Sequence, residues 1–131
     1  MRAIRCREWG APDVLRLEEA ESPRLQRHQV RIRVRAAGVN FADSLMVGGT
    51  YQVKPAFPFT PGLEAAGEIV ETGSAVDGLR AGQRALAVLR NGGGYAEEIC
   101  STPPRWCRSP MRWILSPLPP FRLPTAPRIL R

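Results

Sequence analysis

Three polar side chains, Asn40, Asp43 and Tyr51, stand near one another in the middle of the chain. Asn40 can donate and accept hydrogen bonds, Asp43 can accept them, and Tyr51 carries a hydroxyl on an aromatic ring. This combination suits a cleft that holds and orients a small molecule. A structural interpretation stays open for each residue, because Asn40 and Asp43 are also typical caps of a short helix, and Tyr51 could anchor a loop.

Metal chemistry fits the available side chains poorly. His28 is the single histidine and stands in a polar loop, where we expect it to be solvated. The three cysteines, Cys6, Cys100 and Cys107, show no CxxC spacing. A structural zinc site would need four clustered cysteines, and catalytic zinc needs about three protein ligands. We therefore expect no metal site.

The cysteine count also bears on the compartment. An odd number of cysteines favours free thiols and a reducing environment. The N-terminus, MRAIRCREWG, is charged and lacks the apolar region of a secretory signal. No run approaches the roughly 18 apolar residues of a membrane span. We expect a cytoplasmic protein without a membrane segment.

Six short segments with strand character must position the polar residues. Within Gln29–Gly38, apolar residues alternate with three arginines, which predicts a strand with one packed and one solvated face. The apolar positions are Val30, Ile32, Val34 and Ala36. The other predicted strands are Met1–Cys6, Val14–Glu18, Ala65–Thr72, Arg84–Leu89 and Gly94–Ile99, and the helical candidate is Phe41–Met46. Short strands separated by Gly and Pro favour an all-β barrel or sandwich.

Two loop segments set limits on the site. Lys54–Gly62 contains three prolines and cannot pair as a central strand. It is either a stiff wall of a cleft or a plain connection. Gly92–Gly94 lacks the G-x-G-x-x-G spacing of a dinucleotide site, and no such fingerprint occurs in the sequence. We therefore expect no Rossmann unit in these 131 residues.

The net charge of +7 comes from the last part of the chain. Residues 1–100 hold 13 basic and 12 acidic groups, whereas residues 101–131 hold six arginines, eight prolines and no acid. A nearly neutral body is a poor candidate for binding a phosphate backbone, so we expect no nucleic-acid partner. One interpretation of residues 101–131 is a disordered Pro/Arg-rich extension.

A second interpretation of residues 101–131 is a shift of reading frame near Ile99–Ser101. Trp and Met have single codons, so some residues of the shifted frame are fixed. Trp106–Cys107 would become valine, Trp113–Ile114 aspartate, and Met111–Arg112 alanine or glutamate. With permitted codons elsewhere, Ser101–Arg131 can be read as another sequence, which resembles the continuation of the family described below into its cofactor domain. The DNA sequence across codons 95–105 would decide between the two interpretations.

Two motifs carry a family resemblance. Gly38–Asp43 reads GVNFAD, and Pro61–Val76 reads PGLEAAGEIVETGSAV. In combination, they resemble the N-terminal domain of the medium-chain dehydrogenase/reductase superfamily, specifically the zinc-free NADPH:quinone oxidoreductases. The resemblance covers about residues 1–99. Gln83 departs from it, since relatives usually have an aspartate there, but an amide can make similar hydrogen bonds in a turn.

The resemblance implies a mainly β fold. It would be a GroES-like, partly open β-barrel with one or two short helices over residues 1–100, followed by an irregular tail, 101–131. Asn40 stands where the zinc-dependent alcohol dehydrogenases have a cysteine ligand, and Leu63 where they have a histidine. The resemblance therefore implies that Asn40, Asp43 and Tyr51 line a metal-free site for nicotinamide and quinone.

The implied activity is hydride transfer from NADPH to a quinone or an activated alkene. Because the chain has no Rossmann unit, we expect a fragment that is inactive alone and does not bind NADP(H) tightly. One alternative is a non-enzymatic β-barrel binding module with a basic arm. Another is a fragment of an enoyl or alkenal reductase. The sequence leaves the exact substrate and the oligomeric state open.

Overall fold

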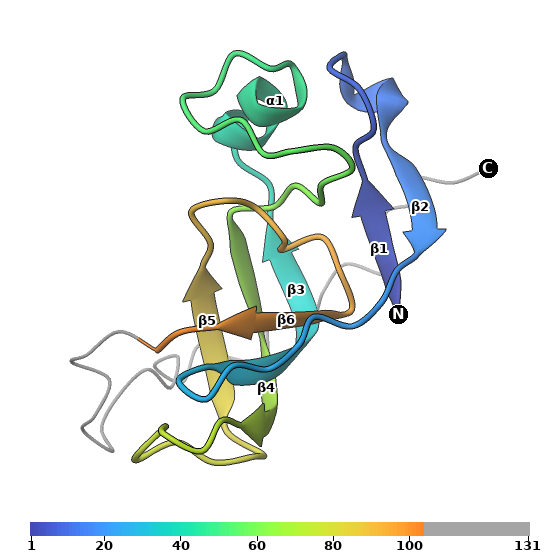
Figure 1. Cartoon of the computed structure of the whole chain (residues 1–131). Coiled ribbons are helices and arrows are strands. Elements are labelled where there is room, and N and C mark those ends of the chain that lie inside the picture. The colour runs from blue at the N-terminus through green and yellow to red at the C-terminus, as the bar shows by residue number, and fades with distance from the viewer. Residues whose placement is uncertain (104–131) are drawn as a thin grey trace, which may run out of the picture.

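The computed structural model describes residues 1–103, and these form six strands, one α-helix and one 3-10 turn (Figure 1). The strands are β1 (Arg2–Arg5), β2 (Arg16–Glu19), β3 (Val30–Gly38), β4 (Glu64–Thr72), β5 (Arg84–Val88) and β6 (Glu98–Ser101), the helix is α1 (Phe41–Val47), and the turn is Pro12–Val14. The predicted helix and the first five predicted strands are present at nearly the predicted positions, whereas the sixth strand is displaced toward the C-terminus. The irregular tail proposed for residues 101–131 lies outside the described residues beyond Pro103.

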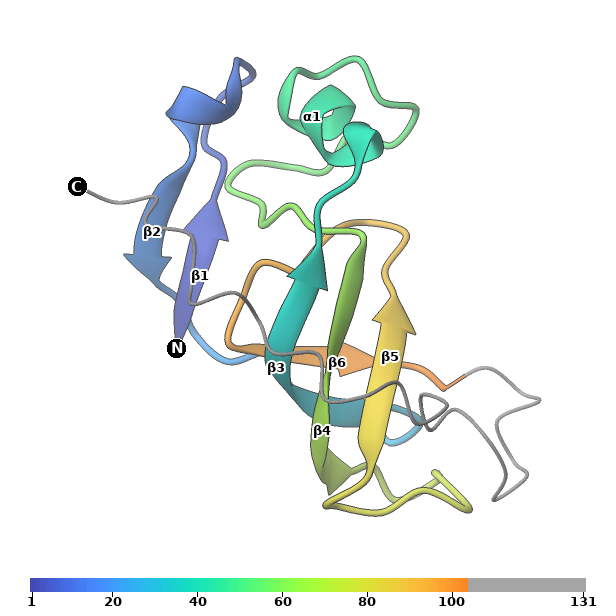
Figure 2. The ribbon, with the colours of Figure 1, turned by 180° about the vertical axis from the view of Figure 1, so that it is seen from behind.

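The strands form two antiparallel sheets. β1 and β2 pair as an antiparallel hairpin, with Ala3 opposite Glu18. The second sheet has the order β5-β4-β3-β6. It is strongly curled, so that β6 runs across the direction of β5, while α1 sits beyond one end of β3 and β4 (Figures 1 and 2). This curled half-barrel confirms the expected mainly β, GroES-like partial barrel.

Irregular pairing bends β3 and changes its predicted faces. The register with β4 shifts between Arg31 and Ile32 and again between Val34 and Ala36. An unpaired extra residue bends a strand and increases its twist. Val30 and Ile32 are buried as predicted, but Ala36 is exposed, and it lies directly beyond the second irregularity. The prediction of Ala36 as a packed residue was wrong.

The last strand also begins later than the sequence predicts, at Glu98 instead of Gly94. The preceding residues pair with β1 first: Ile4 donates its N–H to Tyr95 O at 2.8 Å, and Glu97 donates to Arg2 O at 3.1 Å. Only then does the chain join β3. The segment before β6 therefore links the hairpin to the half-barrel.

Two groups of buried side chains make the core. The sheet cluster lies inside the curled sheet and consists of Val30, Ile32, Ala65, Ile69, Ala87 and Ile99. The helix cluster lies under α1 and consists of Cys6, Met46, Val47 and Phe59. Both combine residues far apart in sequence, so β-pairing and helix position are fixed by long-range burial of apolar surface.

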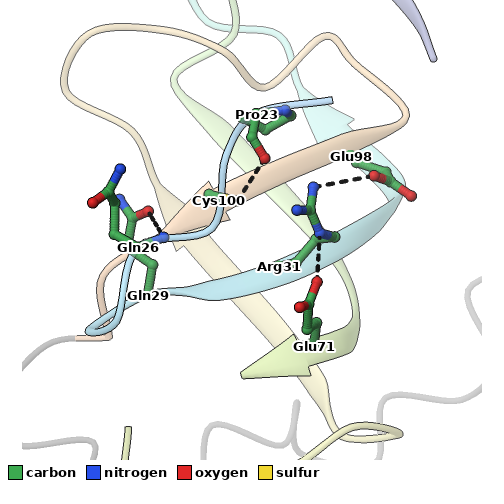
Figure 3. A network of polar contacts seen from close by, with 7 residues as sticks. All are labelled: Pro23, Gln26, Gln29, Arg31, Glu71, Glu98 and Cys100. Carbon is green, nitrogen blue, oxygen red and sulfur yellow. Dashed lines mark hydrogen bonds and ion pairs between the residues drawn. The ribbon is translucent and has the colours of Figure 1, made fainter. Parts of the chain in front are cut away.

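Arg31 shows that the outer face of β3 is not uniformly solvated. Its side chain is only 16% exposed and lies between Glu71 on β4, at 3.0 Å, and Glu98 on β6, at 3.4 Å (Figure 3). In the same region the Cys100 thiol lies 3.6 Å from Pro23 O. The prediction of a fully solvated arginine face was wrong at Arg31, because strand pairing places Glu71 of β4 directly opposite it and Glu98 of β6 within reach.

No helix within residues 1–103 is long and apolar enough to cross a membrane.

Candidate functional site

The site begins where β3 ends and α1 starts. Asn40 has extended backbone, with φ −115°, and occupies the N-cap position of α1. Asp43, three residues later, accepts a hydrogen bond from the Asn40 N–H at 2.8 Å. This is the reciprocal half of a capping box, which satisfies a backbone donor that a helix start leaves unpaired. The structure therefore confirms the interpretation of Asn40 and Asp43 as residues that cap a short helix.

Asp43 does more than cap the helix. The residue is 3% exposed, and its Oδ1 accepts N–H groups from Gly62 at 3.2 Å and Leu63 at 3.1 Å. Its Oδ2 accepts the Tyr95 hydroxyl at 3.0 Å. A buried charge needs such compensation, because its desolvation is otherwise costly. The carboxylate thus connects the start of α1 with two loops that are distant in sequence.

Tyr95 is a site residue that sequence reasoning missed. Its hydroxyl lies 3.0 Å from Asp43 Oδ2 and 3.3 Å from Gly38 O, so it joins the end of β3 to the carboxylate. Burial, followed by the hydrogen bond and charge of Asp43, raises the pKa of the Tyr95 phenol well above its usual value. Asp43 and Tyr95 are 52 residues apart in the sequence, so no local sequence pattern predicts this contact.

Close backbone packing holds the loops around this carboxylate. Gly94 donates its N–H to Gly62 O at 2.9 Å, and Tyr95 donates to Pro61 O at 3.0 Å. Gly62 has φ +102°, and a Cβ there would lie 2.6 Å from Tyr95 Cδ1. Only glycine fits this conformation and contact without strain. Gly92–Gly94 therefore serves loop packing here.

Asn40 itself lies at the edge of the hydrogen-bonded group around Asp43. It is half-buried, whereas its neighbours Val39 and Phe41 are 85% and 79% exposed. Next to it, a Cβ at Gly38 would lie 3.7 Å from Asn40 Nδ2 and 2.8 Å from Glu64 Oε2. An amide, a carboxylate and two exposed apolar side chains therefore share one edge. Such an edge can contact a ligand that is polar in one part and apolar in another.

Tyr51 is not part of the hydrogen-bonded group around Asp43. It is half-buried and packs against the helix cluster, and its N–H donates to Leu45 O at 3.0 Å. Among the hydrogen bonds of residues 1–103, none joins Tyr51 to Asn40 or Asp43. The structure brings Asn40 and Asp43 together and places Tyr51 against the helix cluster, four residues beyond the end of α1. Its role in a ligand site stays a prediction.

The proline-rich loop is fastened at its end. Phe59 and Cys6 exchange two backbone hydrogen bonds, of 2.8 and 3.0 Å. Phe59 and Phe57 also surround Trp9, with ring centroids 5.7 and 4.4 Å away. Lys54–Gly62 is therefore held against the N-terminal segment by backbone pairing and aromatic packing, although it contains no named strand.

The donor set around Asn40 does not fit zinc. Asn40 offers an amide, Leu63 offers an alkyl chain, and both oxygens of Asp43 already accept hydrogen bonds. His28 is exposed, as predicted. Within the described part of the chain, no three His, Cys, Asp or Glu residues gather as a metal-binding group. Catalytic zinc takes Cys, His or carboxylate ligands that are free to coordinate.

Comparison with known proteins gives these features a family context. Residues 26–110 match the family model described as the alcohol dehydrogenase GroES-like domain. The chain belongs to this family. In the GroES-like domain of this chain, the matched range contains β3, α1, β4, β5 and β6 together with Asp43 and Tyr95.

Several proteins to which the chain is similar are named as quinone oxidoreductases or as quinone oxidoreductase-like. A quinone oxidoreductase-like protein 2 homolog of Nematostella vectensis is 47% identical over 102 residues, covering 78% of this chain and 27% of that protein. The quinone oxidoreductase of Lama guanicoe is 45% identical over 98 residues, covering 74% and 30%. The quinone oxidoreductase structure of Thermus thermophilus, solved also with NADPH, has a TM-score of 0.66 and 32% identity, covering 89% and 34%.

These relatives confirm the resemblance to quinone oxidoreductases. The GroES-like chain spans less than a third of the length of the two curated relatives that it matches.

Gln83 stands where the sequence predicted a substitute for a turn aspartate. Its side-chain Oε1 accepts the Arg80 N–H at 2.9 Å. The amide therefore makes a turn hydrogen bond, as expected.

Proposed function

We propose that this chain carries one half of the hydride-transfer cleft of a zinc-free, NADPH-dependent quinone oxidoreductase, formed by residues 1–100. One observation carries the proposal. Asn40 is held by a buried carboxylate at an edge with two exposed apolar neighbours, in a domain similar to quinone oxidoreductases. The apolar neighbours suit a surface that another domain or a ligand would cover.

The roles of the residues follow from their positions. NADPH, when bound, would supply the hydride, and the protein would orient the reactants. The half-buried amide of Asn40 would make hydrogen bonds to the nicotinamide or the acceptor. Asp43, which is almost fully buried, would position the Asn40 backbone and the Gly62–Leu63 loop instead of contacting the ligand. Tyr51 would shape a wall of the cleft next to the end of α1.

Residues 1–131 contain no phosphate-binding fingerprint for a dinucleotide. A fragment without a phosphate-binding loop would neither hold NADP(H) tightly nor turn over. We propose a frameshift near codon 100 as the origin of residues 101–131, and we expect a cytoplasmic location. Sequencing the DNA across codons 95–105 in independent isolates tests the frameshift, and one uninterrupted frame in all of them would reject it.

The decisive experiment compares two proteins. The first protein is the 131-residue chain as it stands, and the second is made from a gene in which the reading frame after codon 100 is restored. The first should show no NADPH oxidation with a quinone at an enzymic rate, whereas the second should show it. A matched pair of variants in the restored protein then tests the site: Asn40→Ala should lower kcat/KM strongly, and the exposed Asn91→Ala should leave it unchanged. Turnover by the unrestored chain would refute the fragment hypothesis, and an active Asn40→Ala variant would refute the role of Asn40.

The same assay decides the substrate class. An enoyl or alkenal reductase would prefer an activated alkene over a quinone in kcat/KM. We expect preference for the quinone, since no strong general acid lies beside Asn40 in the described site and a quinone needs little polarisation.

A further inference from the structure

Strand β5 is an open edge of the curled sheet. In the order β5-β4-β3-β6, it has β4 on one side and no further strand of residues 1–103 on the other (Figure 2). Natural edge strands are commonly protected from pairing by charged side chains, proline or a bulge. β5 reads RALAV, and its one charged residue is the first, Arg84. The strand therefore lacks this protection over most of its length.

The free hydrogen-bonding groups of β5 belong to alternate residues. Directly after the strand, Leu89 donates its N–H to Leu63 O at 2.7 Å. Hydrogen-bonded pairs recur at every second position of an antiparallel register, so Ala85 and Ala87 bond to β4. The residues that alternate with them direct their backbone N–H and C=O groups away from β4. These residues are Arg84, Leu86 and Val88.

The same alternate residues place their side chains on the outer face of the sheet. Leu86 is 52% exposed and Val88 is 71% exposed, whereas Ala87 is buried in the sheet cluster. Directly opposite residues of antiparallel strands have their side chains on one face. The residues of β4 opposite Arg84, Leu86 and Val88 are Glu68, Ala66 and Glu64. The outer face at this edge is therefore apolar at its centre and acidic on either side.

An apolar groove runs along the same strand. It has a volume of about 460 Å³ and is lined by all five residues of β5 together with Val30, Ile32 and Ile69 of the sheet cluster. An open groove that reaches the core leaves apolar surface in water, which favours a covering partner. A strand added beside β5 would extend the wall of this groove and shield it.

The sequence of β5 suits pairing with a second copy of itself. An antiparallel pair centred on Leu86 places Leu86 opposite its counterpart and Arg84 opposite the partner's Val88. All three residues with free backbone groups then bond across the interface. A shift by two residues in one direction would bring Arg84 opposite the partner's Arg90, and like charges directly opposite are destabilising. The reverse shift would bring Val88 opposite the partner's Gly82, which lies outside β5.

Charges also match in the pairing centred on Leu86. One row of side chains would then contain Glu68 and Arg84 of one copy, followed by the partner's Val88 and the partner's Glu64. Arg84 would lie between carboxylates of both copies, and no arginine would face another arginine. This charge arrangement favours a second copy of the chain as the occupant of the edge.

We propose that two copies of this chain associate through their β5 strands, which pair antiparallel about Leu86 and join the two curled sheets. Five residues a side is fewer than the roughly 20–30 a side of a standard protein–protein interface. The dimer should therefore be weak and should form only as the protein concentration rises.

The first test follows amide exchange of the full chain by NMR over a wide range of protein concentration. The N–H groups of Leu86 and Val88 should become protected as the concentration rises, in parallel with a monomer-to-dimer transition in sedimentation velocity. The N–H groups of Ala85 and Ala87 bond to β4 and should be protected at every concentration. This alternation distinguishes strand pairing from unspecific clustering.

Two matched variants test the edge. Leu86→Lys places like charges opposite each other at the centre of the pairing and should weaken dimerisation about tenfold or more. Leu17→Lys changes a leucine of equal exposure, 51%, on the edge strand β2 and should leave dimerisation unchanged. β2 reads RLEE, so charged side chains already protect it. Protected N–H groups of Ala85 and Ala87 in both variants verify that the sheet is folded.

A third variant tests the register. Arg84→Glu would put three carboxylates into the row that holds Glu68 and the partner's Glu64, and should weaken the dimer about tenfold. Added salt should restore part of this loss, because it screens charges on the exposed face.

Four results would overturn the proposal. A monomer at every concentration would show that the edge does not pair. Protection of Leu86 and Val88 even at the highest dilution would show that the edge is covered within one copy. Equal losses for Leu86→Lys and Leu17→Lys would place the contact elsewhere, and a dimer that Arg84→Glu leaves unchanged would reject the pairing about Leu86.

Discussion

Asp43 links the helix start, the Gly62–Leu63 loop and Tyr95 through four hydrogen bonds to one buried carboxylate. Buried donors that lose an acceptor retain their full desolvation cost. The residue therefore acts on several segments at once. Its effect on Asn40 is indirect, because it fixes backbone and not the side-chain amide.

Asp43→Ala should lower the free energy of unfolding by about 3 kcal/mol, since it leaves the buried Gly62 N–H without its acceptor. Asp43→Asn should cost less, because one oxygen remains. Urea unfolding monitored by far-UV circular dichroism measures both. The exposed Asp77→Ala serves as the control and should change stability by less than about 0.5 kcal/mol. Equal losses for Asp43→Ala and Asp77→Ala would contradict the structural role of the buried carboxylate.

Tyr95 predicts a pH dependence of stability. Burial and Asp43 raise the pKa of its phenol in the folded state, so the folded protein binds the proton more tightly than the unfolded chain. This contribution is complete below the unfolded value of about 10 and is lost as the pH rises above it. Urea midpoints between pH 8 and pH 11 should fall for the parent and fall less for Tyr95→Phe. Parallel curves for the two proteins would show that Tyr95 does not contribute.

At the scale of elements, the contact between β3 and β4 depends on one glycine. A Cβ at Gly67 would lie 2.0 Å from Arg33 O and 2.9 Å from Ile32 Cγ2. Both contacted residues belong to β3, so any side chain at position 67 would push the central strands apart. The close contact between β3 and β4 therefore requires a residue without a side chain at position 67.

Gly67→Ala should lower the free energy of unfolding by about 3 kcal/mol or more, because the closest clashing atoms are backbone and cannot turn away. Gly82→Ala is the matched control. Gly82 has φ +87° but nothing within 4 Å of its Cβ position, so its cost is limited to backbone strain of about 1 kcal/mol. Chemical denaturation of both variants gives the comparison, and a smaller loss for Gly67→Ala would mean that the strands tolerate separation.

The elements also show which local predictions succeed. Alternating apolar residues located β3 and the capping residues located α1, because both patterns act within a few residues. The start of β6 was missed, because Tyr95 and Glu97 pair with β1, more than 90 residues away along the chain for Glu97. The register irregularities in β3 were likewise not predicted by any pattern in the sequence.

At the scale of the whole molecule, the excess charge belongs to residues 101–131 and not to the barrel. If the chain were instead a binding module with a basic arm, it would bind single-stranded RNA at low salt, with binding lost as salt rises. We expect no saturable RNA binding in fluorescence anisotropy at low salt. Tight, salt-sensitive binding that disappears when the six arginines are replaced would favour that alternative.

The sequence by itself determined the half-barrel, the helix, the family and the position of Asn40, because alternation, capping and two motifs are local properties. Only the tertiary structure decided that Asp43 is buried, that Tyr95 completes its hydrogen bonds, that Tyr51 packs against the helix cluster, and that an apolar groove reaches the sheet cluster. These features depend on which distant segments meet. Such contacts arise from the curl of the sheet as a whole, and no short stretch of sequence encodes them.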